Sequence, residues 1–175
     1  FLWKGKLDEM METFKIAELF VEMDPSHEPL TSRSKAYAVQ KADHIDASLT
    51  LTDDTYQRYH DKYKDATDSL IEYMVTGSRF YHNLILHNGI LLHSSAVILD
   101  EKAYLFSAPS GTGKSTHTSL WLREFPGSEI LNDDKPAIRI FEDGIYVYGT
   151  PWSGKTDLNL NRKVPLQGIA FLERG

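Results

Sequence analysis

The chain has 175 residues, of which 41% are hydrophobic and 25% are charged, the balance of an ordinary globular protein. Its net charge of -6 argues against a general nucleic-acid binder, which needs a basic surface. The absence of cysteine excludes disulfides, iron–sulfur clusters and thiolate zinc sites. No apolar run reaches the ~18 residues that a membrane span requires. We therefore expect a cytoplasmic protein that binds neither nucleic acid nor membrane.

Residues 1–88 are expected to form a small N-terminal segment of mixed helix and strand. Residues 14–23 are rich in apolar side chains but fit neither the helical nor the strand period, so their structure stays open. Residues 45–51 alternate between apolar and polar side chains and predict a strand. A polar helix is predicted next, from the capping group at Thr52 to about Tyr63.

A second helix is predicted from Thr67 to His87. Asn88-Gly89 is a typical helix end, because both residues tolerate a left-handed backbone. Apolar side chains recur along this helix at helical spacing and predict one buried stripe. Its members are Leu70, Ile71, Met74, Val75, Phe80, Tyr81, Leu84 and Ile85.

From residue 89 onward, short apolar runs typical of strands predict a second domain, 89–175. The runs 90–99 and 103–108 are joined by only three residues, too few for a parallel crossover, so they predict an antiparallel hairpin. A helix is predicted at 114–125 and another hairpin at 137–148. This order predicts an α/β domain with a mixed sheet.

The segment Ala108-Pro-Ser-Gly-Thr-Gly-Lys-Ser115 fits the phosphate-loop pattern, with Ala in place of the usual first Gly. Gly111 and Gly113 let the backbone turn its N–H groups toward phosphate oxygens. Lys114 reaches the β- and γ-phosphates, Ser115 offers its hydroxyl to Mg²⁺, and the following helix directs its positive end at the anion. No Asn-Lys-x-Asp sequence is present to recognise guanine, so we expect ATP with Mg²⁺. The predicted nucleotide-binding residues of this loop are Ser110, Gly111, Thr112, Gly113, Lys114, Ser115 and Thr116.

A second segment, Gly149-Thr-Pro-Trp-Ser-Gly-Lys-Thr156, matches the same pattern. The residues after it alternate like a strand and soon meet Pro165, so no helix N-terminus is predicted there to hold an anion. We expect this segment to line the same site, with Trp152 stacked on the base and Lys155 near a phosphate. Packing of Trp152 on a Gly-rich turn is the alternative interpretation.

Two adjacent carboxylates, Asp133 and Asp134, follow a short apolar strand after the phosphate-loop helix. Neighbours on a strand point to opposite faces, so one can reach the metal while the other meets the phosphate acceptor. A polar turn before Lys135-Pro136 is the alternative. His93 lies among Leu residues in the strand before the predicted hairpin, where it is either a packed core residue or a catalytic one.

Together, His93, the loop Ser110–Ser115 and Asn132-Asp-Asp134 resemble the catalytic domain of the HPr kinase/phosphorylase family. That domain is related in fold to the ATP-dependent phosphoenolpyruvate carboxykinases. The resemblance implies a mixed-sheet P-loop fold in which His93 and Asp133 form an acid/base pair near the acceptor hydroxyl. It implies that Asp134 and Ser115 hold Mg²⁺ and that Lys114 clamps the phosphates.

The resemblance implies a kinase that transfers the γ-phosphoryl group of ATP to a serine of a protein or peptide, and it allows a homo-oligomer. The resemblance is looser through residues 149–174. The segment 148–155 is more like the stand-alone HPr-kinase-like bacterial proteins, some of which accompany peptide-modification genes. Residues 1–88 do not resemble the regulatory kinase's N-terminal domain, so the substrate and any phosphorylase activity stay open. The chain ends directly after a predicted strand, 168–173, so we expect the domain to continue beyond Gly175. A non-catalytic ATP-sensing module acting through a partner is the alternative function.

Overall fold

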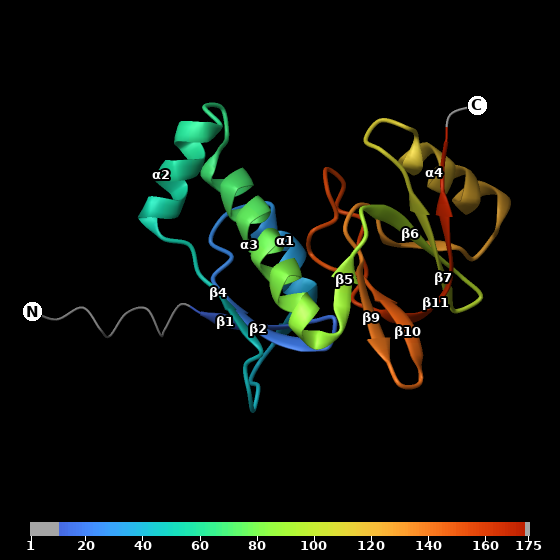
Figure 1. The fold of residues 1–175 in the computed structure, drawn as a ribbon, viewed down its shortest axis with the longest axis horizontal. Coiled ribbons are helices and arrows are strands. Elements are labelled where there is room, and N and C mark those ends of the chain that lie inside the picture. The colour runs from blue at the N-terminus through green and yellow to red at the C-terminus, as the bar shows by residue number, and fades with distance from the viewer. Residues whose placement is uncertain (1–10, 174–175) are drawn as a thin grey trace, which may run out of the picture. The chain divides into compact units, whose positions relative to one another are not determined.

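The computed structural model describes residues 11–173, and Figure 1 shows their helices and strands. The chain divides between Asn83 and Leu84 into two compact units, here called the N-terminal unit and the C-terminal unit. Each unit has its own mixed sheet, so the protein is mixed α/β, as the sequence predicts. No helix within residues 11–173 combines the length and the apolar character that crossing a membrane requires.

The N-terminal unit has a four-stranded sheet in the order β3-β1-β2-β4, in which only the β2–β4 pair is parallel. Its elements are β1 (Glu12–Ile16), β2 (Leu19–Met23), α1 (Leu30–Ser34), the 3-10 helix η1 (Lys35–Tyr37), β3 (Ala38–Val39), β4 (Ala47–Leu49), α2 (Asp53–Lys62) and α3 (Asp68–Leu84).

The segment that the sequence left open, 14–23, forms the hairpin β1–β2. Its turn consists of Ala17 and Glu18, which both have a positive φ, of 52° and 64°. Left-handed residues at both central positions match the twist of the flanking strands. The buried positions are even-numbered before this turn and odd-numbered after it. The turn therefore breaks the alternation, which is why no single period fits the sequence.

The two predicted helices of the N-terminal unit are confirmed. Helix α2 begins as expected after Thr52, whose side chain accepts a hydrogen bond from the Thr55 amide at 3.4 Å. Helix α3 continues into the 3-10 helix η2 (Ile85–His87), and Asn88 ends it with a φ of 55°. The strand predicted at 45–51 is shorter than expected, because only Ala47–Leu49 pair with β2.

The predicted buried stripe of α3 is correct only in part. Ile71, Val75, Phe80, Tyr81 and Leu84 are buried, and Met74 is half-buried. By contrast, 45% of Leu70 and 65% of Ile85 are exposed. Leu70 lies in the first turn of α3, and Ile85 lies in η2, where the tighter helix no longer keeps the 3.6-residue stripe.

The C-terminal unit has a seven-stranded sheet in the order β5-β9-β10-β11-β7-β6-β8. Only the β11–β7 pair is parallel. Its elements are β5 (Gly89–Leu91), β6 (Ser94–Leu99), β7 (Lys102–Ser107), α4 (Lys114–Glu124), β8 (Glu129–Asn132), β9 (Ala137–Phe141), β10 (Gly144–Tyr148) and β11 (Lys163–Phe171).

Both predicted hairpins are confirmed, as β6–β7 and β9–β10. The run 90–99 is not one strand, however. It breaks at Leu92 and His93, so that β5 pairs with β9 while β6 pairs with β7 and β8. The last strand, β11, is longer than the predicted 168–173. Its first half pairs with β10 and its second half with β7, and it therefore joins the two parts of the sheet.

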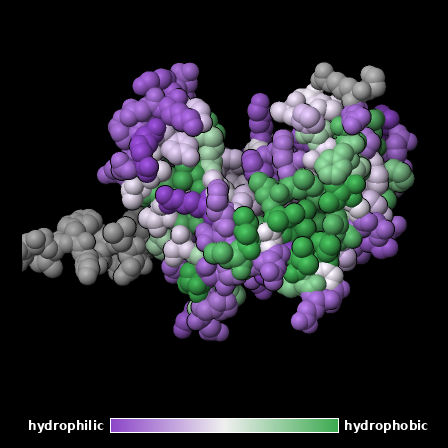
Figure 2. All heavy atoms as spheres, in the orientation of Figure 1, coloured by the Kyte–Doolittle hydropathy of each residue, from purple (hydrophilic) through white to green (hydrophobic). Residues whose placement is uncertain are grey.

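Alternation along β6 and β7 assigns their side chains to two layers. Ala96, Ile98, Ala103 and Leu105 belong to the main core, together with buried residues of β8, β9, β10 and β11. The intervening residues of β7 face α4, where the rings of Tyr104 and Phe106 each lie 5.1 Å from that of Trp121. The sheet thus has its core on one face and α4 on the other. Figure 2 also shows hydrophobic side chains gathered on the surface of this unit, where Ile90, Ile140 and Ile145 are exposed.

Candidate phosphate-binding site

The predicted phosphate loop connects the end of β7 to the beginning of α4. Gly111 has a φ of 77° and Gly113 has a φ of 110°, a backbone conformation that a side chain disfavours. No atom lies within 4 Å of a Cβ built at either residue, so the backbone conformation is what requires glycine there. Helix α4 begins at Lys114, directly after Gly113. The strand–loop–helix order that the sequence predicts is confirmed.

The loop presents unused backbone donors at the start of α4. The first helical hydrogen bond runs from the amide of His117 to the carbonyl oxygen of Gly113, at 2.9 Å. The backbone N–H groups of Lys114, Ser115 and Thr116 therefore lie before the first hydrogen bond of the helix. Within residues 11–173 these three N–H groups have no protein acceptor. Ser110, Ser115 and Thr116 are exposed, and Thr112 donates its amide to the carbonyl of Pro109 at 3.2 Å. Such amides can bind an anion.

The ammonium group of Lys114 lies across the loop. Its Nζ donates to the carbonyl oxygen of Ala108 at 2.9 Å and so links the last residue before the loop to the first residue of α4. Ala108 is buried, and the usual first Gly of the pattern is replaced there by a residue with a small side chain.

Asp133 is held by two hydroxyl groups from other parts of the chain. Ser95 donates to its Oδ1 at 2.9 Å, and Thr156 donates to its Oδ2 at 3.0 Å. The Ser95 hydroxyl also lies 3.4 Å from that of Thr118 on α4, and the Thr118 hydroxyl donates to the carbonyl oxygen of Ser115 at 3.2 Å. This chain of contacts links Asp133 to the first turn of α4.

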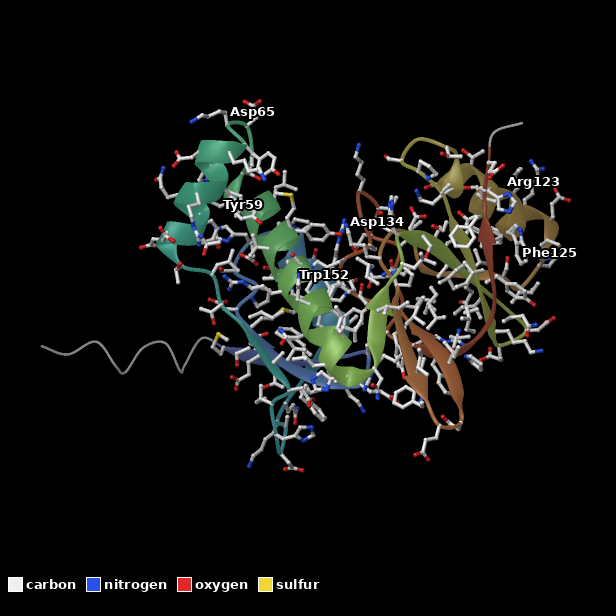
Figure 3. The ribbon with its side chains drawn as sticks, viewed as in Figure 1. Tyr59, Asp65, Arg123, Phe125, Asp134 and Trp152 are labelled. Atoms are coloured by element: carbon white, nitrogen blue, oxygen red, sulfur yellow. The ribbon has the colours of Figure 1, made fainter. Side chains whose placement is uncertain are left out.

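Asp134 has a different set of partners. Its Oδ1 lies 3.0 Å from Nε2 of His93, and its Oδ2 lies 2.7 Å from Nζ of Lys135. The two adjacent carboxylates therefore have different neighbours. Both follow β8 rather than lying within it, so the alternation of strand neighbours does not apply to them, and they lie in the polar turn before Lys135-Pro136 that was the alternative interpretation. Figure 3 labels Asp134 in this segment.

The turn that carries both carboxylates is fixed by Asn132, a fully buried residue. Its Oδ1 accepts from the amides of Asp134 and Lys135, at 3.1 and 2.7 Å. Its Nδ2 donates to the carbonyl oxygen of Thr150 at 3.0 Å. A buried amide with both ends bonded gives the turn one defined shape.

His93 is placed differently from the prediction. It lies in the break between β5 and β6 rather than within a strand, and 49% of its side chain is exposed, so it is not a core residue. Its imidazole contacts Asp134 and not Asp133, the residue with which the resemblance pairs it. The carbonyl of His93 accepts from the Ser107 hydroxyl at 3.0 Å, which anchors the break to the end of β7.

The second motif, 149–156, packs against both carboxylates. Thr156 contacts Asp133, and a Cβ at Gly154 would lie 2.8 Å from Cβ of Asp134. Residues 157–173 contain no helix. Lys155 is exposed, while Trp152, labelled in Figure 3, is only 1% exposed. The burial of Trp152 favours the packing interpretation over stacking on a base.

The sequence did not indicate that Asp133 has two hydroxyl partners, Ser95 and Thr156, or that Thr118 contacts Ser95. Ser95 lies 38 residues before Asp133 in the chain, and Thr156 lies 23 residues after it. The only signal available for Ser95 is its place in a strand beside the loop, where polar side chains on the helix-facing side are unusual. Residues 11–173 contain no group of three or more His, Asp or Glu side chains that could hold a metal ion.

A scan against protein-family models finds no match to this chain, and a search of curated proteins likewise finds none. The fold and the contacts above are therefore the basis on which function is inferred.

Proposed function

We propose that the C-terminal unit binds Mg·ATP at residues 108–116 and transfers the γ-phosphoryl group to a hydroxyl, the serine of a protein or peptide. The observation that carries this proposal is the junction of β7 and α4. It combines two left-handed glycines, a lysine that opens the helix, and three amides without a protein acceptor. This combination is the one by which phosphate loops bind the β- and γ-phosphates of a nucleotide.

Ser115 and Asp134 are the residues that would hold Mg²⁺, whose chemistry is to neutralise the charge that develops on the phosphoryl oxygens. Lys114 and the loop amides act on the same charge. Mg²⁺ keeps several waters and needs few protein ligands, so one hydroxyl and one carboxylate suffice beside the phosphates. His93 and Lys135 hold Asp134 in place through the 3.0 and 2.7 Å contacts.

Asp133 is the proposed acceptor of the hydroxyl proton. The serine oxygen forms a bond to the γ-phosphorus, the bond from that phosphorus to the β–γ bridging oxygen breaks, ADP leaves, and the serine proton passes to the Asp133 carboxylate. Ser95 and Thr156 each donate to one oxygen of that carboxylate, and these contacts orient it. General-base catalysis of this kind contributes roughly 10²–10⁴-fold.

The resemblance of His93, the loop and Asn132-Asp-Asp134 to HPr kinase/phosphorylase supports the same chemistry, and the mixed sheet agrees with the P-loop fold of that family. An ATP-dependent activity also fits the cytoplasm, the compartment that we propose. A homo-oligomer is part of the proposal through the resemblance alone.

The proposal is tested by incubating the full chain with Mg·ATP labelled at the γ-phosphate and a library of serine-containing peptides. We expect label on a subset of peptides, a loss of at least about 100-fold in Asp133→Asn, and unchanged Mg·ATP binding in that variant. Asp143→Asn, at the exposed β9–β10 turn, is the matched control and should retain activity. Unchanged transfer by Asp133→Asn would remove Asp133 from the mechanism. ATP binding with no labelled peptide would favour the sensing module instead.

A further inference from the structure

The N-terminal unit contains a groove that the proposed kinase chemistry does not use. It has a volume of about 550 Å³ and is lined by residues of α2 and α3 together with Ser48 of β4. This volume is within the range of sites that bind small molecules, roughly 300–1,000 Å³. Tyr59, labelled on α2 in Figure 3, is one of the residues that line it.

Each helix turns one continuous face into the groove. The lining residues of α2 are Thr55, Arg58, Tyr59 and Lys62, spaced by three, four and seven positions from the first. Those of α3 include Val75, Ser78, Arg79 and His82, which follow the same spacing. Residues so spaced share one side of a helix. Two helices therefore direct basic side chains toward the same space.

The charge of the groove is opposite to that of the whole chain. The protein has 25 acidic residues against 19 Lys and Arg, yet no Asp or Glu is among the described residues that line the groove. Arg58 is paired with Asp54 on its own helix, with 3.0 Å between Nε and Oδ2. Within residues 11–173, Lys62 and Arg79 have no such ion pair. Convergent cations without an acidic partner repel one another, and an anion between them relieves that repulsion.

The remaining polar groups of the groove can all donate hydrogen bonds. Thr55 is buried at its floor, and Tyr59, Ser78 and Asn83 add hydroxyl and amide groups. Nδ1 of His82 lies 2.6 Å from the carbonyl oxygen of Ser78, so that nitrogen carries the proton that is donated to the carbonyl. A ligand with several charged acceptor oxygens fits such a lining, since guanidinium groups bind phosphate through two parallel hydrogen bonds.

We propose that this groove is a second anion site, which binds the phosphate group of an organic ligand through Arg58, Lys62 and Arg79. It is independent of the phosphate loop and of the proposed kinase reaction. Two kinds of ligand carry such a phosphate group, a free phosphorylated small molecule and a peptide with a phosphorylated serine. Figure 2 shows hydrophilic side chains covering α2, as such a site requires.

The test is an NMR titration of the full chain, following backbone amides of α2 and α3 separately from those of residues 108–116. The probes are inorganic pyrophosphate and a short phosphoserine peptide, with the unphosphorylated peptide as reference. We expect saturable shifts of the α2 and α3 amides with at least one phosphorylated probe, and which of them binds more tightly identifies the source. Lys114→Ala should leave these shifts unchanged, which separates this site from the phosphate loop.

Substitutions of the lining residues test whether the phosphorylated probes bind in the groove itself. Arg79→Gln and Lys62→Gln should each weaken binding by about tenfold, because each removes a charge-assisted hydrogen bond. Arg123→Gln is the matched control on the last turn of α4 and should have no effect (Figure 3). Circular dichroism confirms that each variant is folded. No saturable shift in α2 and α3, or an equal loss of affinity in Arg123→Gln, would overturn the proposal.

Discussion

The contact between Gly154 and Asp134 can be tested by replacing Gly154 with Ala. The φ of Gly154 is 75°, and a Cβ there would lie 2.8 Å from Cβ and 3.0 Å from Cγ of Asp134. Gly127, after α4, offers a matched control, because its φ is 88° but nothing lies within 4 Å of its Cβ position. The two substitutions share backbone strain, and only one of them displaces Asp134.

The expected loss of unfolding free energy follows from two contributions, the backbone strain of a left-handed alanine and the displacement of Asp134. A left-handed alanine costs roughly 1–2 kcal/mol, so we expect a loss of that size in Gly127→Ala. In Gly154→Ala the backbone around Asp134 must also shift, because rotation about χ1 does not move the Cβ atom of Asp134, and the resulting bond-angle strain costs about 1 kcal/mol. The shift also weakens the partly exposed contacts to His93 and Lys135, worth roughly 0.2–1 kcal/mol each. We therefore expect Gly154→Ala to be about 1–3 kcal/mol less stable than Gly127→Ala.

The assay is urea unfolding followed by tryptophan fluorescence in a Trp3→Phe background, so that Trp121 and Trp152 report on the C-terminal unit. Mg·ATP affinity is measured on the same variants. We expect it to fall in Gly154→Ala, because Asp134 is displaced, and to stay unchanged in Gly127→Ala. Equal losses of stability in the two variants would refute the idea that segment 149–156 positions Asp134.

Two further predictions concern side chains that hold carboxylates. Ser95→Ala and Thr156→Val each remove one hydrogen bond to Asp133, so each should cost about 1 kcal/mol of unfolding free energy and lower kcat without changing ATP affinity. Additive effects on kcat in the double variant would show that the two hydroxyls do not act on one group. In the N-terminal unit, burial raises the pKa of Glu72, against the opposing effect of its hydrogen bonds from His27 and Ser26. The folded chain therefore keeps this proton at pH values where the unfolded chain has lost it, and stability should fall as the pH rises from the ordinary glutamate pKa through the raised one. Glu72→Gln should lose this dependence when unfolding midpoints are compared between about pH 4 and 8; parallel profiles for the two proteins would contradict the assignment.

The parts of the fold that the sequence predicts are those with local causes. The strand–loop–helix order around residues 108–115 is predicted because the glycines, Lys114 and the flanking strand and helix lie within a few consecutive residues. The β6–β7 hairpin follows from a connection that is too short for any other arrangement. Helix α2 follows from the cap at Thr52, whose bond to Thr55 spans three residues.

The parts that were missed depend on distant pairing. The break at Leu92 and His93 has no local cause that the sequence shows, because it arises from the pairing of β5 and β6 with different strands. For the same reason His93 was placed in a strand. The contacts of Asp133 with Ser95 and Thr156 exist because β6 pairs with β8 and segment 149–156 returns to the same turn. Neither pairing has a signature in the residues that make the contacts.

Calorimetric titration of Mg·ATP into the full chain tests the central claim most directly, with Lys114→Ala and Lys155→Ala as a matched pair. Both lysines follow a glycine in the same pattern, but only Lys114 opens a helix and lies across a loop with unused amides. The account predicts saturable binding that is lost in Lys114→Ala and largely kept in Lys155→Ala. Binding that survives Lys114→Ala, or that is lost only in Lys155→Ala, would contradict it.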